Sequence, residues 1–277
     1  MTIIQALLLG LLQGITEFLP ISSSGHLVLA ESWLGLEVQQ LLSFDVVLHA
    51  GTLIALIIYF RKTLREMVKG LWIDIKRMLR PHLSNEPRDQ EHPREQVWYL
   101  IVATLPIVLL GPFLRDIIEV YFREPSMVVM MLGVTAILLA LAETIGRRTQ
   151  SGVSSIKNAF LIGFFQVLAV IPGISRSGST IVGGLLGNLE REAAAKFAFL
   201  MAIPAIAGAT IFLSGDLLEI GWGNGGVVTP GPLMVGLLAS MISSFACVHG
   251  MLRFLKTRSL WWFIAYLVLM NLAWFVL

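Results

Sequence analysis

The sequence predicts an all-α protein that crosses a membrane several times. Of its 277 residues, 56% are hydrophobic and 14% are charged, whereas soluble domains carry about 25% charged residues. The mean hydropathy is +0.79, and the shortage of charge extends along the whole chain, which a single membrane anchor would not produce. The one cysteine, Cys247, excludes a disulfide framework and argues against a cysteine-based metal site.

Six apolar segments have about the 20-residue length that a membrane-spanning helix needs. They cover residues 43–60, 97–114, 126–145, 194–214, 231–255 and 260–277. Two other apolar segments, 2–33 and 158–190, contain Gly, Pro and Ser at their centres, and this predicts re-entrant helix-loop-helix elements. The apolar N-terminus lacks the basic start and the A-x-A cleavage site of a signal peptide, so we expect it to belong to the mature fold.

The positions of the basic residues predict the orientation. Residues 61–96 contain nine of the 20 lysines and arginines, smaller groups lie within 147–157 and 253–258, and residues 215–230 contain none. By the positive-inside rule, the basic segments face the cytoplasm, and residues 215–230 and both termini face outward. We expect the polar stretch 81–95 to be a solvated cytoplasmic loop. Its basic charges then serve topology and lipid headgroups, and no nucleic-acid site is expected.

The two interrupted segments predict an internal repeat at an offset of 153 residues. Ile-Ser-Ser-Ser-Gly at 21–25 aligns with Ile-Ser-Arg-Ser-Gly at 174–178, and Gln13 aligns with Gln166. No gap is needed in this alignment. We therefore expect two related elements within one membrane domain.

Topology predicts that the two repeats are inverted. The span 43–60 must run inward, and its repeat partner 194–214 must run outward. The halves 1–145 and 146–277 therefore have opposite orientation. In such folds, broken helices meet near the bilayer midplane and form a site there.

The first interruption carries candidate catalytic residues. Gln13 and Glu17 are four apart and share one helix face, which Pro20 ends. The serines at 22–24 follow, and His26 lies near the start of the next helix. A carboxylic acid and an imidazole inside a membrane segment are costly, which favours a function for both over a purely structural role.

The second interruption carries a candidate phosphate site. Arg176 lies between Ser175 and Ser177, in the middle of an apolar segment. Its planar guanidinium suits bidentate phosphate binding, and the exposed N–H groups of a helix start favour an anion. The alternative is a charge pair with Glu17 that holds the two halves together, and both roles are compatible in a resting state.

At these residues the sequence resembles the undecaprenyl-diphosphatase family, also called bacitracin-resistance proteins. The resemblance is carried by Glu-Phe-Leu-Pro-Ile-Ser-Ser-Ser-Gly-His at 17–26, Pro-Gly-Ile-Ser-Arg-Ser-Gly at 172–178 and Phe-Asp-Val-Val-Leu-His at 44–49. It extends over nearly the whole chain. It implies a multi-pass phosphatase of the bacterial inner membrane that hydrolyses undecaprenyl diphosphate to undecaprenyl phosphate and inorganic phosphate. Such an enzyme recycles the lipid carrier of peptidoglycan synthesis and confers bacitracin resistance.

The resemblance also implies roles for single residues. The family's acidic motif falls on Gln13 and Glu17, and since the first position here is Gln, Glu17 is the surer metal ligand or base for the Mg²⁺ or Ca²⁺ that the family needs. The family's serine turn, histidine and phosphate-binding motif fall on Ser22, Ser23, Ser24, His26, Ser175, Arg176 and Ser177. The implied partners are the lipid diphosphate and membrane lipids. A second copy in a homodimer is one option, and the sequence leaves the oligomeric state open.

We expect Ser23 to be the nucleophile, activated by His26 with Glu17 as the orienting group. Attack by His26 itself, or by water that His26 activates, stays open. Asp45 and His49, four apart at the outer end of a span, either line the site, share its metal or are structural.

Two other functional classes compete with this interpretation. An inverted repeat with Glu, His and Arg at the midplane is also typical of a transporter, so a lipid-phosphate flippase or anion transporter is the main alternative. The repeat partners of Glu17 and His26 are Val170 and Ser179, an asymmetry that favours a fixed catalytic site. The second alternative, a type-2 phosphatidic acid phosphatase, whose motifs include Ser-Gly-His, has no support here, because that family's further basic motif and second histidine have no match in this sequence.

Overall fold

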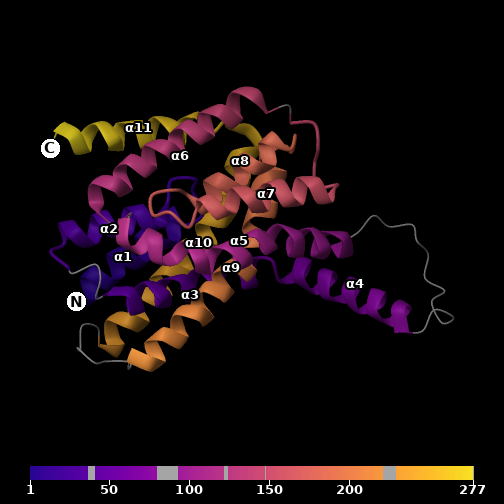
Figure 1. The fold of residues 1–277 in the computed structure, drawn as a ribbon. Coiled ribbons are helices and arrows are strands. Elements are labelled where there is room, and N and C mark those ends of the chain that lie inside the picture. The colour runs from indigo at the N-terminus through magenta and orange to yellow at the C-terminus, as the bar shows by residue number, and fades with distance from the viewer. Residues whose placement is uncertain (37–40, 80–92, 122–123, 147, 221–228, 277) are drawn as a thin grey trace.

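The protein is an assembly of packed helices (Figure 1). The computed structural model describes residues 1–36, 41–79, 93–121, 124–146, 148–220 and 229–276. In these residues the only β pairing is an isolated bridge between Gln150 and Leu189. The helices are α1 (Ile3–Thr16), α2 (Ser23–Trp33), α3 (Leu42–Tyr59), α4 (Arg61–Leu79), α5 (Pro93–Tyr121), α6 (Pro125–Ile145), α7 (Ile156–Leu168), α8 (Arg176–Leu186), α9 (Arg191–Ile220), α10 (Pro230–Thr257) and α11 (Trp261–Val276). The predicted all-α class is confirmed.

Several helices are long and apolar enough to cross a membrane. Four such stretches lie in the described part of the chain: Glu95–Leu114, Pro125–Ile145, Arg191–Phe212 and Pro230–Thr257. A fifth results if α3 and α4 count as one span, bent by 73°. These helices confirm a multi-pass membrane protein.

Two of the six predicted spans are not among these four stretches of the described chain. The predicted span 43–60 corresponds to α3, which passes the test only together with α4. The predicted span 260–277 corresponds to α11, which has 16 residues in its described length. At 1.5 Å per residue it is about 24 Å long, shorter than the roughly 30 Å hydrocarbon core of a bilayer. The predicted polar loop 81–95 lies almost wholly outside the described residues.

Both apolar segments with central Gly, Pro and Ser are broken helix pairs. The first pair, α1 and α2, is separated by residues 17–22, and the second, α7 and α8, by residues 169–175. The two loops are in direct contact, because the Ser177 hydroxyl donates to the Leu19 carbonyl oxygen at 2.9 Å. The fold therefore brings together the two sequence motifs that lie 153 residues apart.

Small residues let α1 approach α10 closely. A Cβ atom at Gly14 would lie 2.0 Å from the Ser243 hydroxyl oxygen and 2.5 Å from the Ser240 carbonyl oxygen. The Ser240 hydroxyl donates to the Leu48 carbonyl oxygen of α3 at 2.9 Å. Glycine and serine at such helix contacts are typical of packing in membranes. The contact fixes the direction of α1, and hence the position of the loop that follows it.

Helix α6 positions the second loop. The Thr135 hydroxyl donates to the Gly173 carbonyl oxygen at 3.0 Å and accepts from the Ser175 N–H at 3.1 Å. Gly173 has a φ of 91°, and a Cβ atom there would lie 2.4 Å from the Val128 carbonyl oxygen. Only glycine satisfies both the left-handed backbone and this close approach.

We expect Gly14→Ala to destabilise the protein by about 1–3 kcal/mol, the usual cost of overpacking a tight contact. Backbone atoms of α10 lie within 2.7 Å of the added carbon, and they cannot move aside as a flexible side chain would. The measurement is the thermal unfolding midpoint in detergent. The control is Gly250→Ala on α10, where the added carbon meets nothing within 4 Å. Equal midpoints for the two variants would contradict this account of the α1–α10 contact.

Candidate active site

Glu17 is the centre of the candidate site. It is the residue that caps the C-terminus of α1, and its side chain is only 3% exposed. One carboxylate oxygen, Oε2, accepts from Gln13 Nε2 at 3.0 Å and from Ser23 Oγ at 2.5 Å. The other, Oε1, pairs with Arg176 Nη2. The structure thus brings together four residues that the sequence singled out.

The Glu17–Arg176 pair links the two halves of the chain. Arg176 is the first residue of α8, and its side chain is 23% exposed. The charge pair that the sequence left as an alternative role for Arg176 is therefore present. Since Glu17 is nearly sealed while Arg176 is partly open, an anion that reaches this surface meets the guanidinium first.

The starts of α2 and α8 have the same side-chain cap, although φ is 70° at Ser22 and -69° at Ser175. Ser22 Oγ accepts from the Gly25 N–H at 3.3 Å, and Ser175 Oγ accepts from the Gly178 N–H at 3.0 Å. Both are side-chain caps of the first helical turn. Ser23 and Arg176 are then the first residues of their helices, where the positive end of the helix dipole favours negative charge.

Most of the loop serines are engaged in holding the loops. Ser22 Oγ lies 3.2 Å from Ser24 Oγ, and Ser175 Oγ lies 3.2 Å from Ser177 Oγ. Among these loop serines only Ser23, which is half-buried, donates to a carboxylate. Phosphate binding by Ser22, Ser24, Ser175 and Ser177 remains a prediction, and their backbone N–H groups suit it better than their hydroxyls do.

His26 takes a different place from the one expected of a base for Ser23. Its Nδ1 lies 2.7 Å from the Ser22 carbonyl oxygen, and its Nε2 lies 2.8 Å from the Tyr266 hydroxyl. A carbonyl can only accept, so Nδ1 carries a proton and the neutral ring accepts from Tyr266 at Nε2. The two rings also stack, with centroids 5.7 Å apart. In the described contacts the acceptor for the Ser23 proton is Glu17.

His49 and Tyr266 also contact residues of the site. His49 Nε2 lies 3.7 Å from Glu17 Oε2, with a side chain that is 31% exposed, and His49 Nδ1 lies 2.8 Å from the Asp45 carbonyl oxygen. His49 therefore lines the site, which is one of the three alternatives that the sequence left open for this residue. Tyr266 was not singled out, because a tyrosine in an apolar helix is equally typical of a membrane interface.

The comparisons with known proteins identify the family of this chain. The family described as "Bacitracin resistance protein BacA" matches residues 6–273. This chain belongs to that family.

Individual family members are similar over nearly the whole chain. An undecaprenyl-diphosphatase of Rubrobacter xylanophilus is 39% identical over 261 residues, which are 93% of this chain and 92% of that protein. An undecaprenyl-diphosphatase of Alkaliphilus metalliredigens is 37% identical over 271 residues, 96% and 95% of the two chains. Another from Methanosphaera stadtmanae is 38% identical over 261 residues. The family resemblance predicted from the two motifs is confirmed.

The oxygen atoms around Glu17 fit a divalent cation that is shared with a bound phosphate. Gln13 Oε1 is buried and has no hydrogen-bond partner in the described part of the chain. The other end of the same amide, Nε2, donates to Glu17. The described residues hold no cluster of three His, Cys, Asp or Glu side chains that could hold a metal ion. Mg²⁺ is commonly held by one or two protein oxygens, waters and substrate phosphates.

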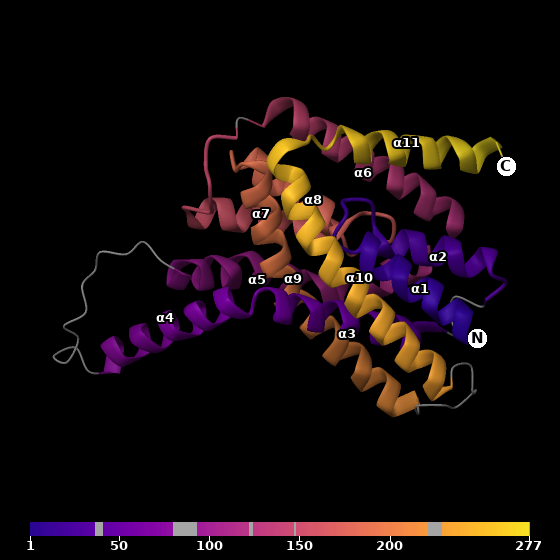
Figure 2. The same ribbon diagram turned by 180° about the vertical axis from the view of Figure 1, so that it is seen from behind.

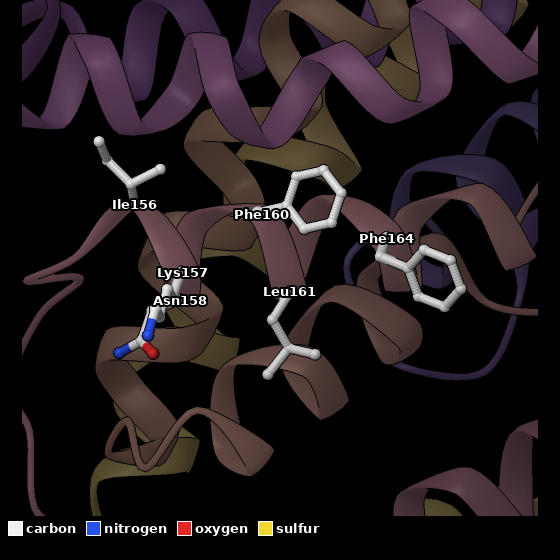
Figure 3. A pocket seen from close by; sticks show the side chains of 6 residues that line it. All are labelled: Ile156, Lys157, Asn158, Phe160, Leu161 and Phe164. Atoms are coloured by element: carbon white, nitrogen blue, oxygen red, sulfur yellow. The ribbon is translucent and has the colours of Figure 1, made fainter.

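The groove in Figure 3 is separate from this constellation. It is lined by residues of α7 alone: Ile156, Lys157, Asn158, Phe160, Leu161 and Phe164. Ile156, Phe160 and Phe164 are exposed. An exposed apolar face on a helix of a membrane protein is the surface that contacts lipid tails.

We expect Tyr266→Phe to lower kcat about two- to tenfold, the factor that corresponds to one lost neutral hydrogen bond of about 0.5–1.5 kcal/mol. KM should stay nearly unchanged, because Tyr266 contacts His26 and not the phosphate-binding loops. The measurement is steady-state phosphate release. The control is Tyr59→Phe, which removes a hydroxyl that lies 3.3 Å from His249 Nδ1 away from the site. An equal loss in both variants, or none in Tyr266→Phe, would remove Tyr266 from the site.

Proposed function

We propose that this protein is an undecaprenyl-diphosphatase of the bacterial inner membrane. It hydrolyses undecaprenyl diphosphate to undecaprenyl phosphate and inorganic phosphate, which recycles the lipid carrier for peptidoglycan synthesis and confers bacitracin resistance. The observation that carries the proposal is the cluster of Glu17, Ser23 and Arg176 at two facing helix starts. It occurs in a chain whose relatives are named undecaprenyl-diphosphatase.

Binding of the diphosphate begins at Arg176. The partly open guanidinium and the N–H groups at the starts of α2 and α8 hold the terminal phosphate. Phosphate oxygens then replace the Glu17 carboxylate as partners of the guanidinium. Glu17 keeps its hydrogen bond from Ser23, which is 2.5 Å long in the resting site, and becomes free to accept a proton.

Ser23 then attacks the terminal phosphorus. As the Ser23 oxygen–phosphorus bond forms, Glu17 takes the hydroxyl proton and the bond between the terminal phosphorus and the bridging oxygen breaks. Undecaprenyl phosphate leaves with the bridging oxygen. Glu17 passes the proton that it took to the departing undecaprenyl phosphate and is again a carboxylate. Water then attacks the phosphorus of the phosphoserine as Glu17 takes a proton from it. The Ser23 oxygen–phosphorus bond breaks, Glu17 returns the proton to the Ser23 oxygen, and inorganic phosphate leaves. Arg176 stabilises the charge on the equatorial phosphate oxygens in both steps.

His26 is a positioning residue in this sequence of steps, held between the Ser22 carbonyl and the Tyr266 hydroxyl. Its hydrogen bond to the Ser22 carbonyl orients the residue directly before the nucleophile. Attack by His26 itself, or by water that it activates, are the two alternative chemistries.

A divalent cation, Mg²⁺ or Ca²⁺, is part of the proposal. Glu17 and Gln13 Oε1 would hold it together with phosphate oxygens. When bound, the cation neutralises charge on the diphosphate and polarises its phosphoryl oxygens.

The placement in the membrane completes the proposal. Six spans and two re-entrant helix pairs form inverted repeats at 1–145 and 146–277, and the site opens toward the outer side. The protein acts on its substrate within the lipid phase and assembles as a homodimer. Arginine- and lysine-rich segments on the cytoplasmic side and the shared cap geometry of α2 and α8 support this arrangement.

The nucleophile is tested by trapping the intermediate. Undecaprenyl diphosphate labelled in its terminal phosphate should leave label on Ser23 after a rapid acid quench, detected by peptide mass spectrometry. Ser23→Ala should lose the label and at least about a thousandfold of the turnover, as removal of a nucleophile does. Label on His26 would move attack to that residue. Unlabelled protein during normal turnover would favour direct attack by water.

The role of the ion pair is tested by Glu17→Gln and Arg176→Ala. Each should reduce phosphate release by about a hundredfold or more, and EDTA should reduce release by the wild type. The matched control is Glu143→Gln, because Glu143 is a buried carboxylate that pairs with Arg191 and Arg148 outside the site. This control should lose stability and keep its turnover per folded molecule. Near-normal release by folded Arg176→Ala would exclude Arg176 from the reaction.

A further inference from the structure

Helix α4 has an exposed apolar stripe that the proposed reaction does not use. Figures 1 and 2 show α4 leaving the helical body beside α5. The helix follows α3 after a bend of 73°. Four large apolar side chains on it are exposed, at three- or four-residue spacing: Val68, Trp72, Ile75 and Leu79. Residues at this spacing lie on one face of a helix.

A row of basic residues runs beside this stripe. At 100° per residue, Lys62, Arg65, Lys69 and Lys76 project next to it on one side. In the described contacts, Arg65 and Lys69 form no ion pair with a carboxylate, so their charges are available. Lys76 Nζ lies 5.4 Å from the centre of the Trp72 ring. An apolar stripe with basic residues along its edge is typical of a helix that lies at a membrane surface.

The stripe and the row meet in a groove at the junction of α3 and α4. The groove is lined by Ile57, Arg61, Leu64, Arg65, Val68 and Lys69. Its three cationic residues are four apart and therefore lie along one edge, next to apolar side chains. A ligand that fills such a groove has a negatively charged head and an apolar tail.

We propose that this groove binds the phosphate of an anionic glycerophospholipid, with α4 lying on the membrane surface and its apolar stripe among the acyl chains. Charge complementarity selects this lipid, since each lysine or arginine near an anionic surface contributes about 1 kcal/mol of attraction. The sequence places this segment on the cytoplasmic side, where the anionic leaflet is found. The inference does not depend on the phosphatase reaction, because none of the groove residues touches the Glu17 cluster among the described contacts.

The test is native mass spectrometry of the full chain, taken from nanodiscs that contain equal amounts of phosphatidylglycerol and phosphatidylcholine. The wild type should retain phosphatidylglycerol in preference to phosphatidylcholine. Arg65→Gln with Lys69→Gln should weaken that retention about tenfold or more, and glutamine preserves helix propensity. The control is Arg253→Gln with Arg258→Gln, two exposed cations at the end of α10, which should retain the lipid.

Three results would overturn the proposal. Equal retention of the two lipids by the wild type would show that the groove does not select anionic lipid. Equal loss in the groove variant and the α10 variant would assign the effect to net charge. Displacement of phosphatidylglycerol by an equimolar amount of undecaprenyl phosphate would assign the groove to a polyprenyl lipid. Phosphate release by the groove variant in detergent should equal that of the wild type, so failure here is distinct from failure of the proposed function.

Discussion

The ion pair between Glu17 and Arg176 is the interaction on which the rest of the site depends. A carboxylate that is 3% exposed inside a membrane protein is costly unless it is paired and hydrogen-bonded. Glu17 meets this requirement with one partner from the second half of the chain and two from the first. The first helix pair supplies the carboxylate of Glu17 and the second supplies the guanidinium of Arg176, so the ion pair fixes the position of one helix pair relative to the other. The packing of Gly14 against α10 and of Gly173 against α6 holds the two helix pairs where this contact can form.

The same ion pair gives a physical reason why Glu17 does not act as a base when no substrate is bound. With Arg176 bound to Glu17, the carboxylate is stabilised in its charged form and the guanidinium has a partner, so neither is left as an isolated buried charge. A phosphate with two negative charges competes for the guanidinium better than a single carboxylate does. In the proposed reaction, substrate binding moves the arginine from Glu17 to the phosphate, so that Glu17 can act as a base only when a phosphate is bound.

Much of this site was predictable, because charge inside an apolar segment is rare enough to be informative. Glu17, Arg176 and the serine turns were found in this way, and the glycine and proline breaks predicted both helix pairs. The partner of His26 was not predictable, since it depends on the rotation of α2 and on how α11 packs, neither of which leaves a local pattern. Tyr266 resembles any interfacial tyrosine. Two of the six predicted spans are not helices of full spanning length in the described residues, because α11 is short and α3 reaches that length only together with α4.

The alignment of the two repeats bears on whether the site acts as a catalyst or a carrier. Ser23 and Arg176 occupy the same repeat position, each as the first residue of its helix, and both contact Glu17, one on each carboxylate oxygen. The two helix starts offer two places for an anion, with a hydroxyl at one and a guanidinium at the other. A carrier that alternates between the two sides of the membrane is expected to have two similar helix starts. A phosphoryl transfer instead needs a nucleophile on one side of the phosphorus and positive charge around it. Val170 stands in place of Glu17 and Ser179 in place of His26, so the second motif lacks the carboxylate and the imidazole of the first. The asymmetry therefore fits a fixed reaction built on a symmetric scaffold.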